Sequence, residues 1–373
     1  MKYKVTRIIG ASLIMTLWVG LAVYAWLKPA DGHSVAERRT LEQKPTFTME
    51  AFASGDYAKA FESYTLDQFP MRDGFRQVKS MFSYYGLWQS DNNNIYVRGG
   101  YVEKLNYPLN SSAVDTAKQV FTTVYENHVQ GKTDNVYVAV VPDKGYYLTQ
   151  ENGFPAMDYE ALQQEMDLPW AEAIDLTDVL QKESYYRTDT HWRQEELIPV
   201  AQKLAQAMGK QGPTAEKYTT QTMDRPFYGV YYGQAALPMR PDEMNLLQSP
   251  VFQNVKAYGY DELGRKVEIP LYHFEAGDDL YDVFLNGSKQ SFVMLENPNA
   301  RTDDHLIIFR DSYACSIAPL FLEDYAKITL VDLRAGQMLP KLVMPYKNAD
   351  VLFLQSSLVL NNPDSYRIWG ENS

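Results

Sequence analysis

Two short segments of this 373-residue chain combine the residue types of a serine nucleophile and its base. Asp189 and His191 lie in the segment 187–192, and Ser312 lies in the segment 309–313. A serine hydroxyl attacks an ester carbonyl when a neutral imidazole takes its proton and a carboxylate holds that imidazole in one tautomer. In an extended backbone the side chains of Asp189 and His191 would leave on the same side, with Cα atoms about 6.6 Å apart. These residues indicate acyl transfer or ester hydrolysis.

Each segment also has a structural interpretation. Asp189 and His191 could form a surface salt bridge, or supply two metal ligands for which the sequence offers no convincing third. Asp311 and Ser312 are both favoured helix caps. The lone Cys315 has no evident cationic neighbour, and such a thiol is most often buried and inert. We expect neither a metal nor a cofactor in this site.

The elements that must position Ser312 are a strand predicted at 306–309 and the helix that follows it. Ligands of open α/β sheets bind at the carboxyl edge, where this serine would lie. Free N–H groups point outward at a helix start, so the Ser312 N–H is a candidate oxyanion donor. Other apolar runs predict buried strands at 136–141, 328–331 and 351–355. Strands alternating with helices indicate an α/β fold with a mostly parallel sheet covered on both faces.

Other patterns complete the predicted organisation. The Gly99-Gly100 pair between two β-rich pieces predicts a hairpin. Apolar residues at three- and four-residue steps predict a helix that Ser111 or Ser112 caps, and another at 197–208. The expected parts of the chain are a cytoplasmic flank and transmembrane anchor at 1–30, a membrane-exit segment and helical lead at 31–90, and an α/β domain at 91–373 with a β-rich insertion at about 211–300.

The first residues indicate a compartment. Lys2, Lys4 and Arg7 precede an uncharged apolar run from Ile8 to Leu27, which is long enough to cross a ~30 Å hydrocarbon layer as a helix. The positive flank should stay in the cytoplasm, so the main domain would lie on the extracytoplasmic side of the cell membrane. A cleaved signal peptide is the alternative, because the segment 23–25 could serve as a small-residue cleavage site. The length of the run and its aromatic residues favour an uncleaved anchor.

Composition excludes several classes of function. A net charge of -12 without basic patches argues against nucleic acid as a partner. One cysteine permits no intrachain disulfide, no multi-thiolate zinc site and no CxxC redox pair. The 28 tyrosines and 6 tryptophans could stack on sugar faces, although most such rings are expected to pack in the core.

Six short segments occur along the chain in a specific order. They are Phe69-Pro70-Met71-Arg72-Asp73, Pro142-Asp143-Lys144, Arg187 to Trp192, Phe227-Tyr228-Gly229, Tyr281-Asp282-Val283-Phe284-Leu285 and Arg310-Asp311-Ser312-Tyr313. This order resembles the DHHW family of bacterial envelope proteins, which is similar to the alginate O-acetyltransferases with an SGNH-hydrolase-like domain. In the alginate enzymes the Asp-x-His segment precedes the serine segment, as it does here. The resemblance implies a three-layer SGNH-hydrolase-like domain.

The resemblance also implies roles for individual residues. Ser312 would be the nucleophile, His191 the general base and then acid, and Asp189 the residue that orients His191. Thr190 stands where the DHHW segment has a second His, and Arg310 stands where SGNH enzymes usually have Gly. The candidates for contacting the substrate or the oxyanion are Gly287, Ser288, Arg310, Tyr313 and Lys144.

We therefore expect a membrane-anchored extracytoplasmic O-acyltransferase or serine esterase that acts on acetyl groups of a cell-envelope or secreted polysaccharide. The polysaccharide would be the acceptor, and relatives work beside a membrane-bound O-acyltransferase that exports the acyl group. The alternative is a non-catalytic polysaccharide-binding or scaffolding protein of an export and modification complex.

Overall fold

The computed structural model divides the chain into two compact units. The smaller unit consists of Met1–Asn93 and Tyr232–Met239, and the larger consists of Asn94–Tyr231 and Arg240–Ser373. The structure describes the whole chain except residues 1, 262–263, 278, 288, 336–347 and 368–373. The boundaries expected near residues 30 and 90 stay predictions of domain organisation.

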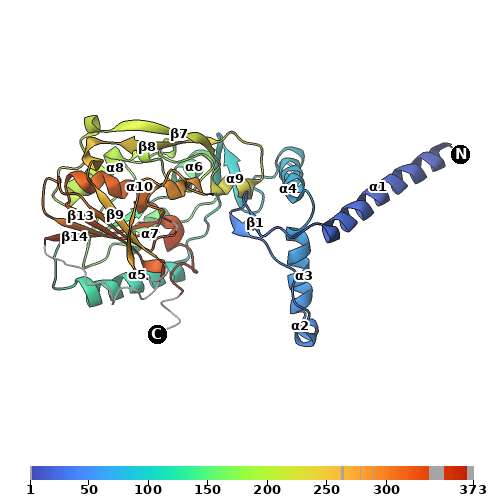
Figure 1. Cartoon of the computed structure of the whole chain (residues 1–373), viewed down its shortest axis with the longest axis horizontal. Coiled ribbons are helices and arrows are strands. Elements are labelled where there is room, and N and C mark those ends of the chain that lie inside the picture. Colours follow the sequence, from blue (N-terminus) through green and yellow to red (C-terminus); the bar gives the residue numbers. More distant parts are fainter. Residues whose placement is uncertain (1, 262–263, 278, 288, 336–347, 368–373) are drawn as a thin grey trace. The chain divides into compact units, whose positions relative to one another are not determined.

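The larger unit is built on an eight-stranded sheet in the order β10-β9-β11-β13-β12-β14-β5-β6. Figure 1 labels β9, β13 and β14 of this sheet. The strands from β13 to β6 pair in parallel, and β11, β9 and β10 extend the β13 edge in antiparallel pairing. The strands are β5 (Val136–Val141), β6 (Glu172–Ala173), β9 (Lys256–Tyr260), β10 (Lys266–Ile269), β11 (Phe292–Glu296), β12 (His305–Arg310), β13 (Lys327–Asp332) and β14 (Ala349–Ser356).

Two hydrophobic cores on opposite faces of this sheet make the three layers that the sequence predicts. On one face, Ile308 of β12 lies in the same buried cluster as Leu204 of helix α8 (Ile198–Ala207). On the other, the next residue, Phe309, shares a cluster with Phe121 of helix α5 (Ser111–Val124). All six residues of β12 are buried, because helices cover both faces of the strand. The predicted fold class is confirmed.

The helices and the hairpin follow their local signals with one correction. The side chain of Asn110, rather than Ser111 or Ser112, caps α5 by accepting the Ala113 N–H at 3.1 Å. Gly99 and Gly100 have φ angles of 57° and 84°, which glycine adopts without strain, and they join β3 (Ile95–Arg98) to β4 (Tyr101–Lys104). Short helices elsewhere are α6 (Gly145–Asn152), α7 (Tyr159–Glu165), α9 (Val230–Ala235), α10 (Ala314–Ile317) and α11 (Ser357–Leu360).

The region 211–300 contains strands β7 to β11, and three of them belong to the main sheet. β7 (Thr219–Phe227) and β8 (Asp242–Gln248) form a separate two-stranded sheet. β9, β10 and β11 instead continue the central sheet, because Val293 and Leu295 of β11 are buried in its core beside β13. Among the strands that the structure describes in this region, β7 and β8 therefore lie outside the central sheet.

The smaller unit begins with helix α1 (Lys2–Leu27), in which the stretch Tyr3–Leu27 is long and apolar enough to cross a membrane. A signal sequence has the same properties, so this helix is an anchor or a signal. The unit continues through β1 (His33–Ser34), β2 (Arg39–Thr40), α2 (Met49–Ser54), α3 (Asp56–Asp67) and α4 (Arg72–Met81), followed by a wide helical turn at Phe82–Gly86.

Candidate active site

The turn that follows β12 carries Ser312, at the carboxyl edge of the sheet. The next helix, α10, begins at Ala314, so Ser312 lies before the helix rather than in its first turn. The buried carboxylate of Asp311 accepts the Tyr313 N–H at 3.0 Å and the N–H of Ser356, at the end of β14, at 2.7 Å. Asp311 therefore fixes the turn that presents Ser312.

A second buried carboxylate, Asp143, links the carboxyl ends of β14 and β5. Asp143 follows β5 and is buried, and its Oδ2 accepts the hydroxyl proton of Ser357 at 2.8 Å. The phenol of Tyr159 donates to its Oδ1 at 2.7 Å. The ends of β12, β14 and β5 are thus linked by side-chain hydrogen bonds.

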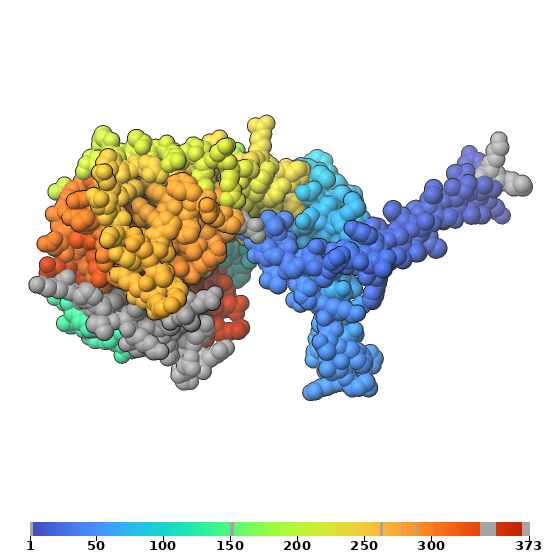
Figure 2. Space-filling model, viewed as in Figure 1, coloured from blue at the N-terminus to red at the C-terminus, as the bar shows by residue number. Residues whose placement is uncertain are grey.

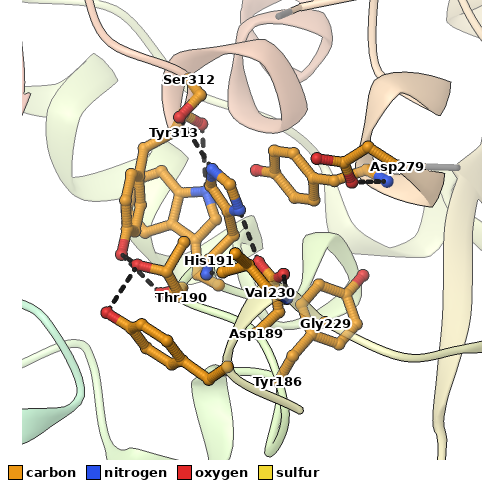
Figure 3. A network of polar contacts seen from close by, with 12 residues as sticks. Tyr186, Asp189, Thr190, His191, Gly229, Val230, Asp279, Ser312 and Tyr313 are labelled. Atoms are coloured by element: carbon orange, nitrogen blue, oxygen red, sulfur yellow. Dashed lines mark hydrogen bonds and ion pairs between the residues drawn. The ribbon is translucent and has the colours of Figure 1, made fainter. Parts of the chain in front are cut away.

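Ser312, His191 and Asp189 form one hydrogen-bonded series (Figure 3). Ser312 Oγ lies 2.7 Å from His191 Nε2, and His191 Nδ1 lies 2.6 Å from Asp189 Oδ1. Asp189 is fully buried, whereas 12% of the His191 side chain is exposed. This is the geometry in which an imidazole accepts a serine proton while a carboxylate holds its other nitrogen.

The segment that carries Asp189 and His191 is a tight loop rather than an extended strand. Tyr185 and Trp192 pair across its base, and the Tyr186 N–H donates to the His191 carbonyl at 3.1 Å. Asp189 Oδ1 also accepts the backbone N–H of His191 at 3.0 Å. Such side-chain bonding two residues ahead is typical of aspartate in turns, and here it brings the carboxylate to the imidazole.

The far side of Asp189 is held by the segment after β7. The Val230 N–H donates to Asp189 Oδ2 at 2.8 Å, so both carboxylate oxygens have partners (Figure 3). A Cβ on Gly229 would lie 2.3 Å from the Cβ of Asp189, which leaves no room for a side chain. The Gly229 N–H also donates to Thr188 Oγ1 at 3.0 Å. This contact gives the Phe227-Tyr228-Gly229 segment a structural role that its sequence does not reveal.

Asp242, at the start of β8, is a further support of the loop that sequence reasoning missed. Its carboxylate accepts the N–H groups of Arg187 at 3.0 Å and Thr188 at 2.8 Å. It also accepts the Thr188 hydroxyl at 2.6 Å. No motif marks this aspartate, because its partners lie more than fifty residues earlier in the chain.

Aromatic side chains enclose the imidazole. The ring of Tyr281 stacks on His191, and its hydroxyl lies 2.8 Å from Ser316 Oγ. The Trp192 indole donates to the same oxygen at 2.8 Å and to the Tyr313 carbonyl at 3.1 Å. Burial raises the pKa of the Tyr281 phenol well above its usual value, so this residue stays neutral beside the imidazole.

The Lys144 side chain supports the loop that carries Asp189 and His191 from inside the protein, so it does not face a substrate. Its ammonium group is fully buried and donates to the carbonyls of Tyr186 at 3.0 Å, Arg187 at 3.4 Å and Asp189 at 2.5 Å. The Glu103 carboxylate is 3.8 Å away. Burial lowers the pKa of Lys144 and raises that of Glu103 to about 8.

The other candidates for substrate or oxyanion contact have structural partners as well. Arg310 is buried, and its guanidinium donates to the Gln290 and Gly287 carbonyls. The Gly287 N–H donates to the Phe284 carbonyl at 3.1 Å, so it is not free for an oxyanion. The Tyr313 phenol donates to the Thr190 carbonyl at 2.5 Å. Ser288 lies outside the described residues.

One oxyanion donor remains from the sequence prediction. Within the part of the chain that the structure describes, no protein acceptor takes the backbone N–H of Ser312.

Cys315 is no rival nucleophile, because it is buried against Gly287 and burial raises the pKa of its thiol. Among the described residues, no group of three or more His, Cys, Asp or Glu side chains could hold a metal ion.

Comparison with known proteins identifies the fold. Residues 103–261 match the family model of the SGNH hydrolase-like domain of acetyltransferase AlgX. A DHHW family protein from Eubacterium siraeum has a TM-score of 0.61 and 20% identity, over 75% of this chain and 96% of that chain. Bacillus cereus PatB1, in a structure with a sulfonyl adduct, has a TM-score of 0.60 and 15% identity, over 74% of this chain and 99% of that chain. No curated protein matches this chain at a significant level. The chain therefore contains an SGNH hydrolase-like domain, and the resemblance inferred from the sequence is confirmed.

Proposed function

We propose that the chain is a membrane-anchored, extracytoplasmic serine O-acyltransferase or esterase that acts on acetyl groups of a cell-envelope or secreted polysaccharide. The observation that carries the proposal is the hydrogen-bonded series Ser312–His191–Asp189, with distances of 2.7 and 2.6 Å. The match to an acetyltransferase family model supports acetyl as the transferred group.

The first half of the reaction acylates the serine. His191 Nε2 takes the hydroxyl proton as Ser312 Oγ attacks the acetyl carbonyl, and Asp189 stabilises the imidazolium that forms. The Ser312 N–H donates to the oxygen that becomes negative in the tetrahedral intermediate. When this intermediate collapses, the bond to the donor oxygen breaks, and His191 gives its proton to the departing alcohol.

The second half releases the acetyl group. A hydroxyl of the acceptor, or water, loses its proton to His191 and attacks the carbonyl of the acetyl-serine. The bond to Ser312 Oγ then breaks, and the protonated His191 returns the proton to that oxygen. Attack by a sugar hydroxyl is acyl transfer, and attack by water is ester hydrolysis, so the same residues serve both reactions.

The location of the domain is part of the proposal. Helix α1 is long and apolar enough to span a membrane, and the positive residues before it favour an extracytoplasmic main domain. An enzyme on that side needs an acyl donor there, so we include a membrane-bound O-acyltransferase as the supplier. Intact mass of the protein from the membrane fraction of its host distinguishes an anchor, which retains α1, from a cleaved signal peptide.

The decisive experiment uses the full chain in detergent with a chromogenic acetyl ester. Ser312→Ala and His191→Ala should abolish hydrolysis, whereas Cys315→Ala, which removes the other candidate nucleophile, should retain it. A serine-directed phosphonate should add to wild type and to Cys315→Ala but not to Ser312→Ala, as intact mass would show. Equal hydrolysis by wild type and both triad variants would contradict the proposal. Polysaccharide binding without any acyl-enzyme would favour the scaffolding alternative.

A further inference from the structure

Helix α4 and the wide turn after it carry an exposed apolar stripe. Phe75, Val78, Phe82 and Tyr85 are 44%, 60%, 61% and 70% exposed. Their spacing of three, four and three residues places them along one face of a helix. This segment is part of the blue surface in Figure 2, as the colour bar shows by residue number.

The opposite face of the same helix is polar and turned inward. Ser80 and Ser83 are only 2% and 6% exposed. Arg72 and Arg76 form ion pairs with Glu37 at 2.5 and 3.2 Å. A helix on a water-facing surface has the reverse arrangement, with its apolar face against the core and its polar face outside.

The interior of the smaller unit is polar beyond α4 as well. Asp67 and Gln68 are only 7% and 3% exposed. The Arg39 guanidinium donates to the Asp67 carboxylate and lowers the pKa of that group to about 2. Polar groups inside and apolar groups outside are the arrangement expected where the surroundings are lipid rather than water.

The apolar stripe is continuous with the candidate membrane helix. The ring of Trp18 in α1 lies 6.4 Å from that of Phe69, and Phe69 lies 5.4 Å from Phe75, the first residue of the stripe. At the other end of the stripe is Trp88, which is 87% exposed. Tryptophan and tyrosine favour the boundary between the hydrocarbon and the headgroups.

We propose that α4 and the turn at Phe82–Gly86 lie in the surface of the membrane that holds α1, with the apolar stripe in the acyl-chain boundary. This inference rests on the proposed function, in which helix α1 is a membrane anchor. Such interfacial helices bury their apolar face roughly 5–10 Å deep. The exposed ammonium of Lys79 follows Val78 of the stripe and suits the phosphates of anionic lipids. Lipid is thus the occupant for which the apolar face and its flanking charge are suited.

The test places an environment-sensitive fluorophore on introduced cysteines in the full chain. Phe82→Cys reports on the stripe, and Asp73→Cys is the matched control, because it is exposed on the same helix outside the stripe. Leu17→Cys reports on α1. Wild type controls for the native Cys315, which is buried and should not be labelled. The proteins are reconstituted in vesicles of phosphatidylcholine and phosphatidylglycerol, with or without brominated acyl chains.

We expect brominated lipid to quench the probe at position 82 several-fold more than the probe at 73, and aqueous iodide to show the opposite order. Quenching at position 17 but not at 82 overturns the interfacial assignment while leaving the anchor intact. Absence of lipid quenching at both positions overturns the anchor and the assignment together. If position 82 is protected from both quenchers, the stripe is covered by protein, such as a second copy, and the lipid proposal is also wrong.

Discussion

The imidazole of His191 lies parallel to the ring of Tyr281, with ring centroids 3.7 Å apart and an interplanar angle of 10°. The stack sets the plane in which Nε2 meets the Ser312 hydroxyl. Because Tyr281 is in turn held by Ser316, the orientation of the base is fixed by α10, the helix that follows the nucleophile.

Replacing Tyr281 tests whether this stack orients the base. Tyr281→Phe keeps the ring and loses only the bond to Ser316, so we expect kcat within a few-fold of wild type. Tyr281→Ala frees the imidazole, and a displacement of about 1 Å can cost about 10²-fold in rate. Hydrolysis of an acetyl ester measures both. Equal losses in the two variants would show that the hydroxyl, not the stacked ring, is what matters.

Asp189→Asn should lower kcat by about 10⁴-fold, the scale found when a triad aspartate becomes an amide. If the amide nitrogen faces His191 Nδ1, the imidazole carries its proton on Nε2 and cannot accept one from Ser312. Asp242→Asn is the matched control, because that carboxylate accepts from Arg187 and Thr188 of the same loop rather than from the imidazole. We expect it to lower the melting temperature more than kcat. A comparable loss of kcat in both variants would argue for a purely structural role of Asp189.

Gly229→Ala should displace the loop that carries Asp189. The added Cβ would lie 2.3 Å from both the Asp189 Cβ and the Thr188 carbonyl oxygen. Overpacking of this kind typically costs about 1–3 kcal/mol. Gly277→Ala is the control, since nothing lies within 4 Å of a Cβ there. The melting temperature and the rate of ester hydrolysis should both fall for Gly229→Ala and stay unchanged for Gly277→Ala. A wild-type melting temperature for Gly229→Ala would refute the contact.

Lys144→Met should destabilise the larger unit by about 1–3 kcal/mol for each buried carbonyl left without a donor. The carbonyls of Tyr186 and Asp189 would lose the Lys144 ammonium, whereas the Arg187 carbonyl would keep the Val102 N–H. Because its raised pKa keeps Glu103 protonated at neutral pH, the double variant Lys144→Met/Glu103→Gln should be about as stable as Lys144→Met. A double variant that recovers most of the loss would show that Glu103 carries a charge beside Lys144.

Glu103 should also make stability depend on pH. Its pKa is raised to about 8 by burial, so the folded chain binds its proton more tightly than the unfolded chain does. This contribution is complete below the ordinary carboxyl pKa and is lost as the pH rises through about 8. Glu103→Gln should therefore show a smaller fall in melting temperature than wild type between about pH 5 and pH 8. Parallel curves for the two proteins would mean that Glu103 does not titrate in this range.

The sequence predicted the sheet and the reacting groups because both depend on short-range patterns. The apolar runs of β5, β12 and β14 indicate strands covered on both sides, and they are confirmed. The order of the Asp-x-His and serine segments identified the residues that the structure brings into hydrogen-bond distance.

The supports of the site could not be predicted, because they join residues distant in the chain. Val230 meets Asp189 across 41 residues, and Lys144 reaches the Asp189 carbonyl across 45. Nothing in the sequence near Lys144 or Arg310 says that their side chains turn into the protein. Periodicity likewise reveals an apolar stripe on a helix such as α4, but not whether that stripe faces a core or the surroundings.

The hydrogen bond between Asp311 and the Ser356 N–H has a consequence for the timing of maturation. Ser356 belongs to β14, which follows β12 in the chain and pairs with it in parallel. In a chain still being synthesised or translocated past β12, Asp311 can already accept the Tyr313 N–H, but its bond to β14 is still missing. We therefore expect the turn that presents the serine to be held fully only after β14 has docked, so that the serine matures late in the folding of the domain.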